Sequence, residues 1–347
     1  MLTFYNEHHA QHRGRHEMFR GEMVPCFEKP ERADMVLAEL QRRALGSIVA
    51  PREVALAALE RIHPARYLHF LRTAWSQWIA LDPANAERDA FPSVWPIRGH
   101  RSDVEPDNFA ARMGLYSMDG GTPLTAGSWI AAKTGADCAI SAAQALRQGE
   151  RGAFALTRPP GHHAGADFFG GYCFLNNAAL AAQHLLDDGA RKVAILDIDY
   201  HHGNGTQSIF YGRADVLFVS IHADPRSEYP FYLGHADETG EGAGSGYNLS
   251  LPLPHGASSA QWFAALEAGC ARLAGFGADA LVVSLGVDTF AGDPLSHFAL
   301  QSSDFLRIGA RIAQLGLPTA FVFEGGYAVA EVGINAVNVL EGFESAI

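Results

Sequence analysis

Histidines and aspartates gather in short segments of this sequence, and both residue types bind metal ions and transfer protons. The densest cluster is Asp197-Ile-Asp199-Tyr-His201-His202. Carboxylate oxygens and imidazole nitrogens are ligands of Zn²⁺ and of other borderline divalent ions. Asp199, His201 and a third ligand, Asp288, would leave one coordination position open, as catalytic zinc sites do. The alternative is a buried Asp–His pair without a metal, but adjacent carboxylates are costly to bury unless a cation compensates them.

Two further segments contain residues suited to proton transfer. His162-His163 follows Pro159-Pro160-Gly161, and two adjacent histidines near a metal-bound water can act as base and acid. Alternatively, both are metal ligands or ordinary loop residues. Tyr327 follows Gly325-Gly326, which is either a flexible hinge for the phenol or a plain turn. Another pair, His8-His9, has no strand or carboxylate pattern around it and is interpreted as a solvated segment.

Five short apolar runs would position these residues. They span residues 153–157, 193–198, 216–221, 280–285 and 319–323, and the helix-like segments around them span 128–147, 177–187, 259–274, 303–315 and 329–343. Such alternation is typical of a buried, mainly parallel sheet. The carboxyl ends of parallel strands meet at one edge of a sheet, where ligands bind. Each run leads directly into polar residues, so we expect five separate segments to build one site.

The first part of the chain is organised differently. Residues 31–45, 53–62 and 67–79 have apolar residues at helical spacing, with Pro51 just before the second run. Residues 81–127 contain five prolines and form a long irregular segment, which inside a compact domain is usually functional or a linker. Because no strand-rich core precedes this segment, we predict one domain over residues 1–347, with an inserted Pro-rich loop at about 82–106.

Composition excludes several classes of protein. The net charge is -12 and there is no Lys/Arg run, so we expect no nucleic-acid partner. The four cysteines are scattered, which indicates a reducing compartment rather than a disulfide framework. We also expect no membrane span and no signal peptide, because there is no stretch of 18 or more apolar residues and residues 1–17 are polar. A cytoplasmic location follows as an expectation.

Four long motifs resemble the zinc-dependent histone deacetylase superfamily. They are Arg158-Pro-Pro-Gly-His-His-Ala164, Gly170-Gly-Tyr-Cys-Phe-Leu-Asn-Asn177, Asp197-Ile-Asp-Tyr-His-His-Gly-Asn-Gly-Thr206 and Glu324-Gly-Gly-Tyr327. Their order and spacing match the superfamily from about residue 20 to residue 347. Gly21-Glu22-Met-Val-Pro25, Asp167-Phe-Phe-Gly-Gly-Tyr172 and the Pro-rich insertion make the chain most similar to bacterial acetylpolyamine amidohydrolases within it.

The resemblance implies roles for individual residues. It implies an arginase-deacetylase fold with about eight strands, one catalytic Zn²⁺ and a structural K⁺. The implied zinc ligands are Asp199, His201 and Asp288; the catalytic residues are His162, His163 and Tyr327; the potassium ligands are Asp197, Asp199, His201, Ser220 and Ile221, partly through backbone carbonyls.

The implied substrate is a small cationic acetylated amine. In the polyamine enzymes, carboxylates at the tunnel mouth hold the distal ammonium group, and Glu17 matches one such position. The second falls within residues 103–109, where Phe109 could stand in place of an acid, with Asp103, Glu105 and Asp107 nearby. Tyr172 and Tyr229, with Gly171, would line the tunnel, unless the two tyrosines are ordinary packing residues.

Four functions are compared. The first is hydrolysis of acetylated polyamines; the second is deacetylation of acetyl-lysine in proteins or peptides; the third is a non-catalytic binder with the same fold. The third is disfavoured because no ligand or catalytic residue is lost. An arginase-like ureohydrolase would need ligands for two manganese ions. Finally, Phe91, Val94, Trp95 and Ile97 on the Pro-rich loop predict a homodimer in which this loop helps close the partner's tunnel.

Overall fold

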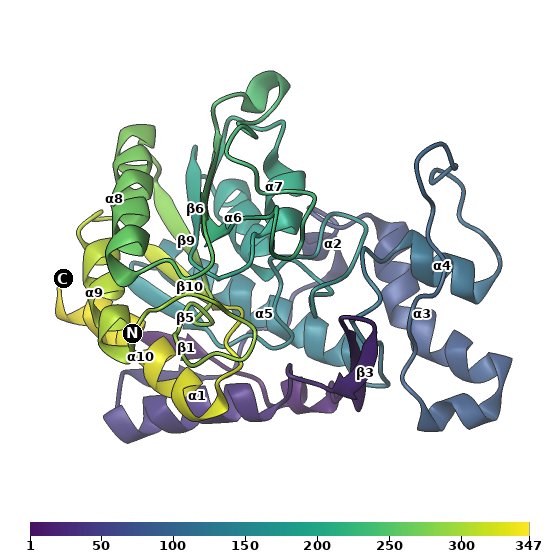
Figure 1. Cartoon of the computed structure of the whole chain (residues 1–347). Coiled ribbons are helices and arrows are strands. Elements are labelled where there is room, and N and C mark those ends of the chain that lie inside the picture. Colours follow the sequence, from purple (N-terminus) through teal and green to yellow (C-terminus); the bar gives the residue numbers. More distant parts are fainter. Residues whose placement is uncertain (347) are drawn as a thin grey trace.

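An eight-stranded parallel sheet forms the centre of the protein in the computed structural model, which describes residues 1–346 (Figure 1). The strand order is β4-β1-β5-β10-β9-β6-β7-β8. The strands are β1 (Leu2–Phe4), β4 (Ser47–Val49), β5 (Gly152–Ala155), β6 (Val193–Asp197), β7 (Val216–Ala223), β8 (Asn248–Leu253), β9 (Ala280–Leu285) and β10 (Thr319–Phe323). The predicted fold class, a single α/β domain with a parallel sheet flanked by helices, is confirmed.

Helices cover both faces of the sheet, and the sheet separates the hydrophobic core into two parts (Figure 1). One part includes residues of α2 (Leu56–Leu59), α3 (Ala65–Leu81), α4 (Phe109–Leu115), α5 (Ser128–Arg147), α6 (Asn177–Asp187) and α7 (Asn204–Phe210). The other includes residues of α1 (Glu31–Arg43), α8 (Ser259–Phe276), α9 (Ser302–Ala313) and α10 (Val329–Ser345). Along β6, Val193 and Ile195 belong to the first part, whereas Ala194 and Leu196 belong to the second. Because both faces are buried, the strand sequence is continuously apolar.

A two-stranded antiparallel hairpin lies outside the main sheet. It consists of β2 (His16–Phe19) and β3 (Glu22–Pro25). Arg20 and Gly21 form its turn with φ values of 52° and 87°, as the right-handed twist of a two-residue hairpin requires. The hairpin carries Glu17 toward the functional edge of the sheet. Three short 3₁₀ segments, Glu7–Gln11, Pro83–Glu87 and Gly242–Gly244, complete the regular structure of the described residues.

The helix predicted over residues 53–62 is wrong at both ends, because helical structure there is limited to α2. The backbone N–H of Arg52 donates to Ser141 Oγ at 2.9 Å, and that of Val54 donates to Asp137 Oδ1 at 3.0 Å. These side chains of α5 hold the segment in a non-helical conformation, although its apolar spacing favours a helix. The five predicted helices after residue 127 are confirmed with bounds shifted by at most two residues at either end.

His9 does not lie in a solvated segment, which corrects the interpretation of His8-His9. The His9 side chain is buried, its Nε2 lies 3.2 Å from the Tyr5 hydroxyl, and its carbonyl accepts a hydrogen bond from Arg158 Nη1 at 2.6 Å. Residue 9 therefore packs under the loop that contains His162 rather than facing solvent.

The Pro-rich loop at 82–106 lies beside α3 and α4, at the right-hand side of Figure 1. Trp95 anchors it by donating a hydrogen bond from Nε1 to Ser117 Oγ at 2.9 Å. Val94 and Ile97 remain 52% and 66% exposed. An anchored loop therefore presents apolar side chains to solvent. These side chains could contact a second copy of the chain, as the predicted homodimer requires.

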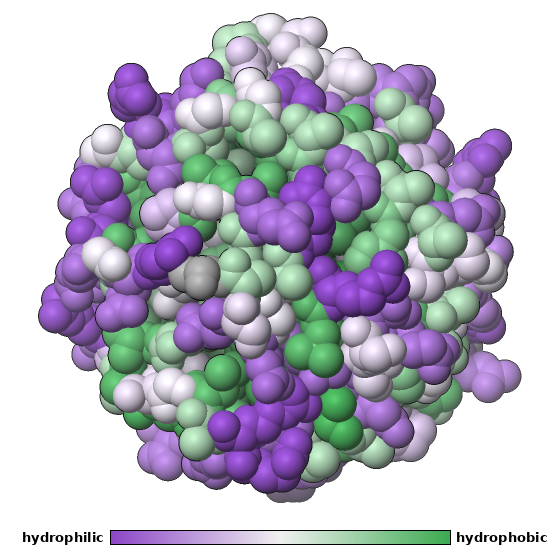
Figure 2. Space-filling model, turned by 90° about the vertical axis from the view of Figure 1, so that its left-hand side faces the viewer, coloured by the Kyte–Doolittle hydropathy of each residue, from purple (hydrophilic) through white to green (hydrophobic). Residues whose placement is uncertain are grey.

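The described residues contain neither a candidate membrane span nor a disulfide bond. No helix in residues 1–346 combines the length and hydrophobicity that crossing a bilayer requires. Figure 2 shows hydrophobic and hydrophilic residues interspersed over one face, with hydrophilic residues along much of its outline. The four cysteines, all within the described residues, are unpaired.

Candidate metal centre and active site

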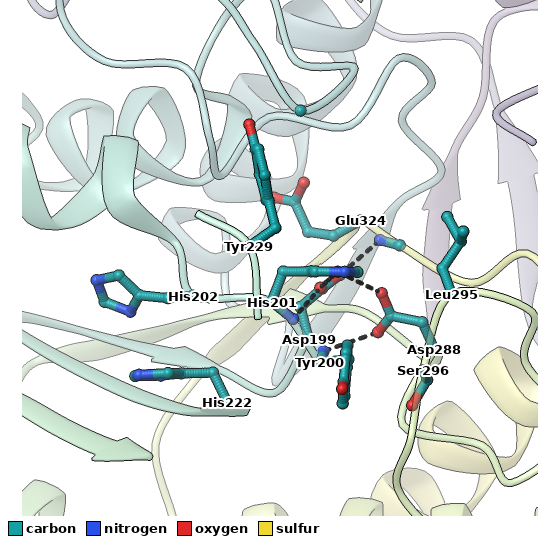
Figure 3. A network of polar contacts seen from close by, with 12 residues as sticks. Asp199, Tyr200, His201, His202, His222, Tyr229, Asp288, Leu295, Ser296 and Glu324 are labelled. Carbon is teal, nitrogen blue, oxygen red and sulfur yellow. Dashed lines mark hydrogen bonds and ion pairs between the residues drawn. The ribbon is translucent and has the colours of Figure 1, made fainter. Parts of the chain in front are cut away.

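Asp199, His201 and Asp288 converge at the carboxyl edge of the sheet. Asp199 and His201 follow β6, and Asp288 follows β9, its neighbour in the sheet. One ligand atom from each residue lies within 4.8 Å of those from the other two. Figure 3 shows the three side chains pointing toward one another. The structure therefore brings together the three residues predicted to bind zinc.

Backbone groups fix the orientation of the two carboxylates. Asp199 Oδ2 accepts a hydrogen bond from the Gly325 N–H at 2.8 Å, and Asp288 Oδ1 accepts one from the Tyr200 N–H at 2.8 Å. A Cβ atom on Gly325 would lie 2.4 Å from Asp199 Oδ2, and one on Gly286 would lie 2.1 Å from it. Glycine at both positions keeps the ligand oxygens free of steric conflict.

The charge of this cluster fits a divalent cation. Burial lowers the pKa of His201, but Asp199 and Asp288 outweigh burial and raise it to about 10. Burial and the neighbouring Asp199 carboxylate raise the pKa of Asp288 to about 7. The negative charge that favours a proton on His201 would equally favour a metal ion, and two carboxylates with one imidazole are a donor set suited to Zn²⁺.

His162 and His163 lie next to this cluster but have different partners. His162 Nδ1 donates to Asp197 Oδ2 at 3.0 Å, whereas His163 Nδ1 donates to the amide oxygen of Asn204 at 2.7 Å. Burial opposes charge on both rings. For His162, the carboxylates of Asp199 and Asp197 outweigh burial and raise its pKa to about 10. For His163, burial and the charges of the neighbouring histidines lower the pKa well below its usual value.

Glu324 fixes the loop that carries the two histidines. It follows β10, and its Oε2 accepts hydrogen bonds from the backbone N–H groups of Gly161 and His162 at 2.5 and 3.2 Å. Burial, the largest influence, raises the pKa of this carboxyl to about 8. The strand end that leads to Tyr327 is thereby joined to the strand end that leads to His162.

A buried ion network supports the Tyr327 turn from below. Glu28 accepts hydrogen bonds from Arg158 at 2.7 and 2.9 Å and from Arg32 at 2.9 Å. Arg32 also donates to the Gly326 carbonyl at 2.5 Å, and its guanidinium lies 4.7 Å from the centre of the Tyr327 ring. Gly326 itself has a φ of +132°, which only glycine adopts readily. The Gly325-Gly326 segment is therefore a braced turn rather than a free hinge.

Asp293 holds the same turn from the other side. Its Oδ2 accepts hydrogen bonds from the backbone N–H groups of Tyr327 and Ala328 at 2.6 and 3.0 Å. Its Oδ1 accepts one from the Leu295 N–H at 3.0 Å. One buried carboxylate thus connects the Tyr327 turn to the Leu295 loop, and both segments line the cavity described next.

A cavity of about 780 Å³ opens above these residues. His163, His201 and Tyr327 contribute to its wall, together with three acidic residues, Glu17, Asp119 and Glu228. Glu17 accepts a hydrogen bond from the Tyr172 hydroxyl at 2.7 Å, and burial raises the pKa of its carboxyl to about 7. A cavity of this volume can hold a small molecule, and His201 of the metal cluster lies in its wall.

Besides Glu17 and Glu228, the cavity wall includes the carboxylate of Asp119, whereas no residue of the 103–109 segment lies there. Asp103 pairs with Arg101 on the surface, Glu105 accepts a hydrogen bond from Tyr116, and Phe109 packs into the core. None of these is among the lining residues found within the described part of the chain, and neither is Asp107. Asp119 lies in the Gly-rich part of the irregular segment, where sequence reasoning proposed no site residue. The only sequence signal was an aspartate followed by two glycines.

Aromatic residues form the rest of the inner wall. The Tyr229 hydroxyl donates to Asp119 Oδ2 at 2.7 Å, and its ring meets His163 edge-on at 5.0 Å. Tyr172 packs edge-on against Tyr327 at 5.7 Å. A Cβ atom on Gly171 would lie 2.2 Å from His163 Cδ2, so glycine there lets the backbone approach the histidine. All three residues predicted to line a tunnel lie at the cavity.

Of the residues predicted to bind potassium, Asp199 and His201 belong to the metal cluster, and the other three come from two neighbouring strands. Asp197 is the last residue of β6, and it is the register partner of Ser220 on β7, which Ile221 follows. The Ser220 hydroxyl is 2.8 Å from His222 Nδ1 and 3.2 Å from His202 Nδ1. Strand pairing therefore brings Asp197, Ser220 and Ile221 into one layer of the sheet beside Asp199.

Comparison with known proteins agrees with this geometry. The model of the histone deacetylase domain matches residues 26–343. Acetylpolyamine amidohydrolase 2 of Pseudomonas aeruginosa is 55% identical to this chain over 344 residues, which cover 99% of each chain. The acetylpolyamine amidohydrolase of Mycoplana ramosa is 46% identical to it over 342 residues, which also cover 99% of each chain. The crystal structure of an acetylpolyamine aminohydrolase from Burkholderia pseudomallei superposes with a TM-score of 0.95 at 40% identity, covering 100% of this chain and 99% of that one. Family model, full-length relatives and fold therefore agree, and the chain belongs to the histone deacetylase family.

Proposed function

We propose that the protein is a zinc-dependent amidohydrolase that removes acetyl groups from acetylated polyamines or related small amines. The observation that carries the proposal is the composition of one cavity wall, where His163, His201 and Tyr327 share the space with Glu17 and Asp119. The first three residues suit amide hydrolysis, and the two acids suit a cationic substrate. The full-length relatives named above for acetylpolyamine hydrolysis support the same function.

Asp199, His201 and Asp288 would hold the zinc ion. When bound, it would supply polarisation of the amide carbonyl and a bound water whose pKa falls to about 7. Binding of the ion to His201 would also displace the proton that the neighbouring carboxylates favour on this ring in the absence of metal.

The chain's own residues move the proton. His163 is held neutral by its surroundings, and its Nδ1 is occupied by Asn204, so Nε2 is the nitrogen that accepts the proton of the attacking water. The water oxygen bonds to the carbonyl carbon, the carbon–nitrogen bond breaks, and His163 returns the proton to the departing amine. Acetate and the free amine are the products.

His162 and Tyr327 stabilise charge during this step. The carboxylates around His162 keep it protonated, so it acts as a fixed positive charge beside the reacting group. Tyr327 donates its hydroxyl hydrogen to the carbonyl oxygen as negative charge accumulates there. Because the turn before Tyr327 is braced by Arg32 and Asp293, the phenol needs little reorganisation.

Substrate selection would depend on the two wall carboxylates that accept hydrogen bonds from Tyr172 and Tyr229, Glu17 and Asp119. An acetylated diamine carries an ammonium group a few carbons from its amide, and Glu17 and Asp119 offer it negative charge, with Tyr172 and Tyr229 beside its alkyl chain. Among the alternatives, acetyl-lysine in a peptide has the same amide and alkyl chain, but lacks this distal ammonium group.

A potassium ion and a homodimer complete the proposal. Asp197, Asp199, His201, Ser220 and Ile221 would hold K⁺ in the layer below the zinc site, where it would offset the carboxylates. The exposed apolar residues of the Pro-rich loop would pack against a second copy of the chain.

A substrate panel tests the function. We expect kcat/KM to be highest for N-acetylputrescine, N-acetylcadaverine or acetylspermidine and lower for acetyl-lysine peptides. In the Asp119→Asn variant, kcat/KM should fall for the cationic amines but change little for an uncharged N-alkylacetamide, which serves as the matched control substrate. A higher kcat/KM for acetyl-lysine peptides than for every acetylated amine would overturn the polyamine assignment.

A further inference from the structure

A second group of metal-ligating side chains lies at the rim of the cavity. It consists of Glu228, His255 and His297, and one ligand atom of each lies within 4.8 Å of the other two. Glu228 lies in the segment between β7 and β8, His255 in the loop between β8 and α8, and His297 in the segment between β9 and α9. Three separate segments therefore deliver one carboxylate and two imidazoles to the same place.

Hydrogen bonds hold the carboxylate of this group in position. Glu228 Oε2 accepts a hydrogen bond from the Tyr200 hydroxyl at 3.1 Å and lies 3.3 Å from His255 Nε2. Its Oε1 accepts a hydrogen bond from the Tyr229 backbone N–H at 3.0 Å. Metal-binding carboxylates are typically oriented in this way by outer partners.

The two histidines are held near each other by the backbone. The Gly256 N–H donates to the His297 carbonyl at 2.7 Å, which joins the two loops next to the histidine side chains. The rings are tilted by 36°, with centroids 4.5 Å apart. The His255 side chain is 38% exposed, so an ion can reach the group from solvent.

We propose that Glu228, His255 and His297 form a second, surface site for a divalent transition metal, with Zn²⁺ as its natural probe. Two imidazoles and one carboxylate suit Zn²⁺ better than Mg²⁺ or Ca²⁺, which favour oxygen ligands. The site is distinct from the Asp199–His201–Asp288 cluster, which is buried and shares none of its residues.

Because the proposed site lies at the entrance of the cavity, a metal ion bound there would affect how substrate enters. Glu228 and His297 both line the cavity that contains the buried cluster. An ion bound there neutralises Glu228 and adds positive charge at the entrance, which opposes the approach of a cationic substrate. This consequence depends on the proposed function, whereas binding of the metal does not.

Calorimetric titration of the enzyme already loaded with one equivalent of Zn²⁺ tests the binding. We expect a second equivalent of Zn²⁺ to bind, and His255→Ala to weaken it by about tenfold or more, because loss of a ligand costs at least as much as loss of an outer partner. His69→Ala removes another exposed histidine, on α3, and should leave the titration unchanged. His255→Gln, which keeps most of the side-chain volume, guards against a folding defect and should behave like the alanine variant.

Two results would overturn the site. One is a titration of the parent enzyme that ends at a single equivalent. The other is a second equivalent that binds both His255 variants as tightly as it binds the parent enzyme. Steady-state kinetics then separates the site from the proposed function. With an acetylated diamine, excess Zn²⁺ should raise KM in the parent enzyme and not in His255→Ala. Binding of the second equivalent to an enzyme that hydrolyses no acetylated amine would support the site while overturning the function.

Discussion

His162 and His163 are neighbours in the chain, yet their surroundings favour a positive charge on His162 and a neutral ring on His163. The carboxylates of Asp199 and Asp197 favour the protonated form of His162, whereas the partner of His163, the amide of Asn204, carries no charge. A general base must be neutral to accept a proton, so activity is lost as the pH falls through the pKa of His163. Burial and the charges of the neighbouring histidines keep the pKa of His163 low, and the neutral partner at position 204 adds no negative charge that would raise it strongly.

Replacing Asn204 with aspartate tests this relation. The Asn204→Asp variant places a carboxylate against His163 Nδ1, which stabilises the protonated ring and raises its pKa. We expect the acidic limb of the profile of kcat/KM against pH to move to higher pH. An acidic limb at the parent position would show that His163 is not the base that limits activity.

Tyr327 should contribute mainly in the transition state. Removal of one hydrogen-bond donor to a developing oxyanion typically lowers kcat by about a hundredfold to a thousandfold. We expect Tyr327→Phe to show a loss of that size, with the zinc content and the circular dichroism spectrum of the parent enzyme. Near-parental kcat on the best acetylated amine would make the Gly325-Gly326-Tyr327 segment a structural turn and remove the phenol from the mechanism.

The roles of individual residues could be predicted only in part. The types and spacing of Asp199, His201 and Asp288 predicted a metal cluster, because strand ends in a parallel sheet must meet. Asp119 could not be predicted in the same way. It lies in a segment without periodicity, and it reaches the cavity through contacts with the Gly171 N–H and the Tyr229 hydroxyl. Contacts between segments that are distant in the sequence cannot be predicted from the spacing of residue types within one segment.

At the scale of elements, Asp293 links the start of α10 to the loop after β9. If Asp293 acts by positioning the Tyr327 hydroxyl, its effect on kcat should disappear when that hydroxyl is absent. We expect Asp293→Asn to lower kcat by about tenfold or more in the parent enzyme and by much less in the Tyr327→Phe background, as coupled residues do in a double-mutant cycle. KM should change less than kcat. Equal losses in both backgrounds would indicate a general structural role.

Elements were predictable where burial imposes a simple pattern. The central strands are covered on both faces and are therefore continuously apolar, as β6 and β9 show. β4 and β8 are the outer strands, and β8 includes Pro252, which edge strands tolerate because one side of their backbone lacks a partner. β1 has only three residues. Short or outer strands carry too few buried residues to produce a recognisable run.

At the scale of the whole molecule, the metal should stabilise the fold as well as the reaction. An ion that binds the folded chain and not the unfolded chain raises Tm. We expect exhaustive dialysis against a chelator to remove about one Zn²⁺ per chain, abolish activity and lower Tm. Addition of Zn²⁺ should restore both, whereas Mg²⁺ should not, because the ligand set includes an imidazole. Full activity with no metal found by elemental analysis would refute the zinc assignment.

The proposed dimer can be tested at Ile97, which is more exposed than Val94 on the same Pro-rich loop. Ile97→Asp adds a charge where the Pro-rich loop presents its side chain to solvent. We expect light scattering to give twice the chain mass for the parent protein and a shift toward the monomer for Ile97→Asp. Ser93→Asp, at another exposed position of the same loop, is the matched control. An unchanged mass in Ile97→Asp would place the interface elsewhere, and a monomeric parent would refute the dimer.

The strand order also affects how the chain folds while it is being synthesised. β10 lies between β5 and β9 in the centre of the sheet, although it follows both in the chain. During synthesis, the facing edges of β5 and β9 therefore stay unpaired until residues 319–323 emerge. Exposed central edges are sites of intermolecular pairing, and assembly that depends on distant contacts is slow. A chain interrupted before β10 should accumulate as aggregate, and rapid overproduction should lower the soluble yield more than it would for a protein whose sheet grows in chain order.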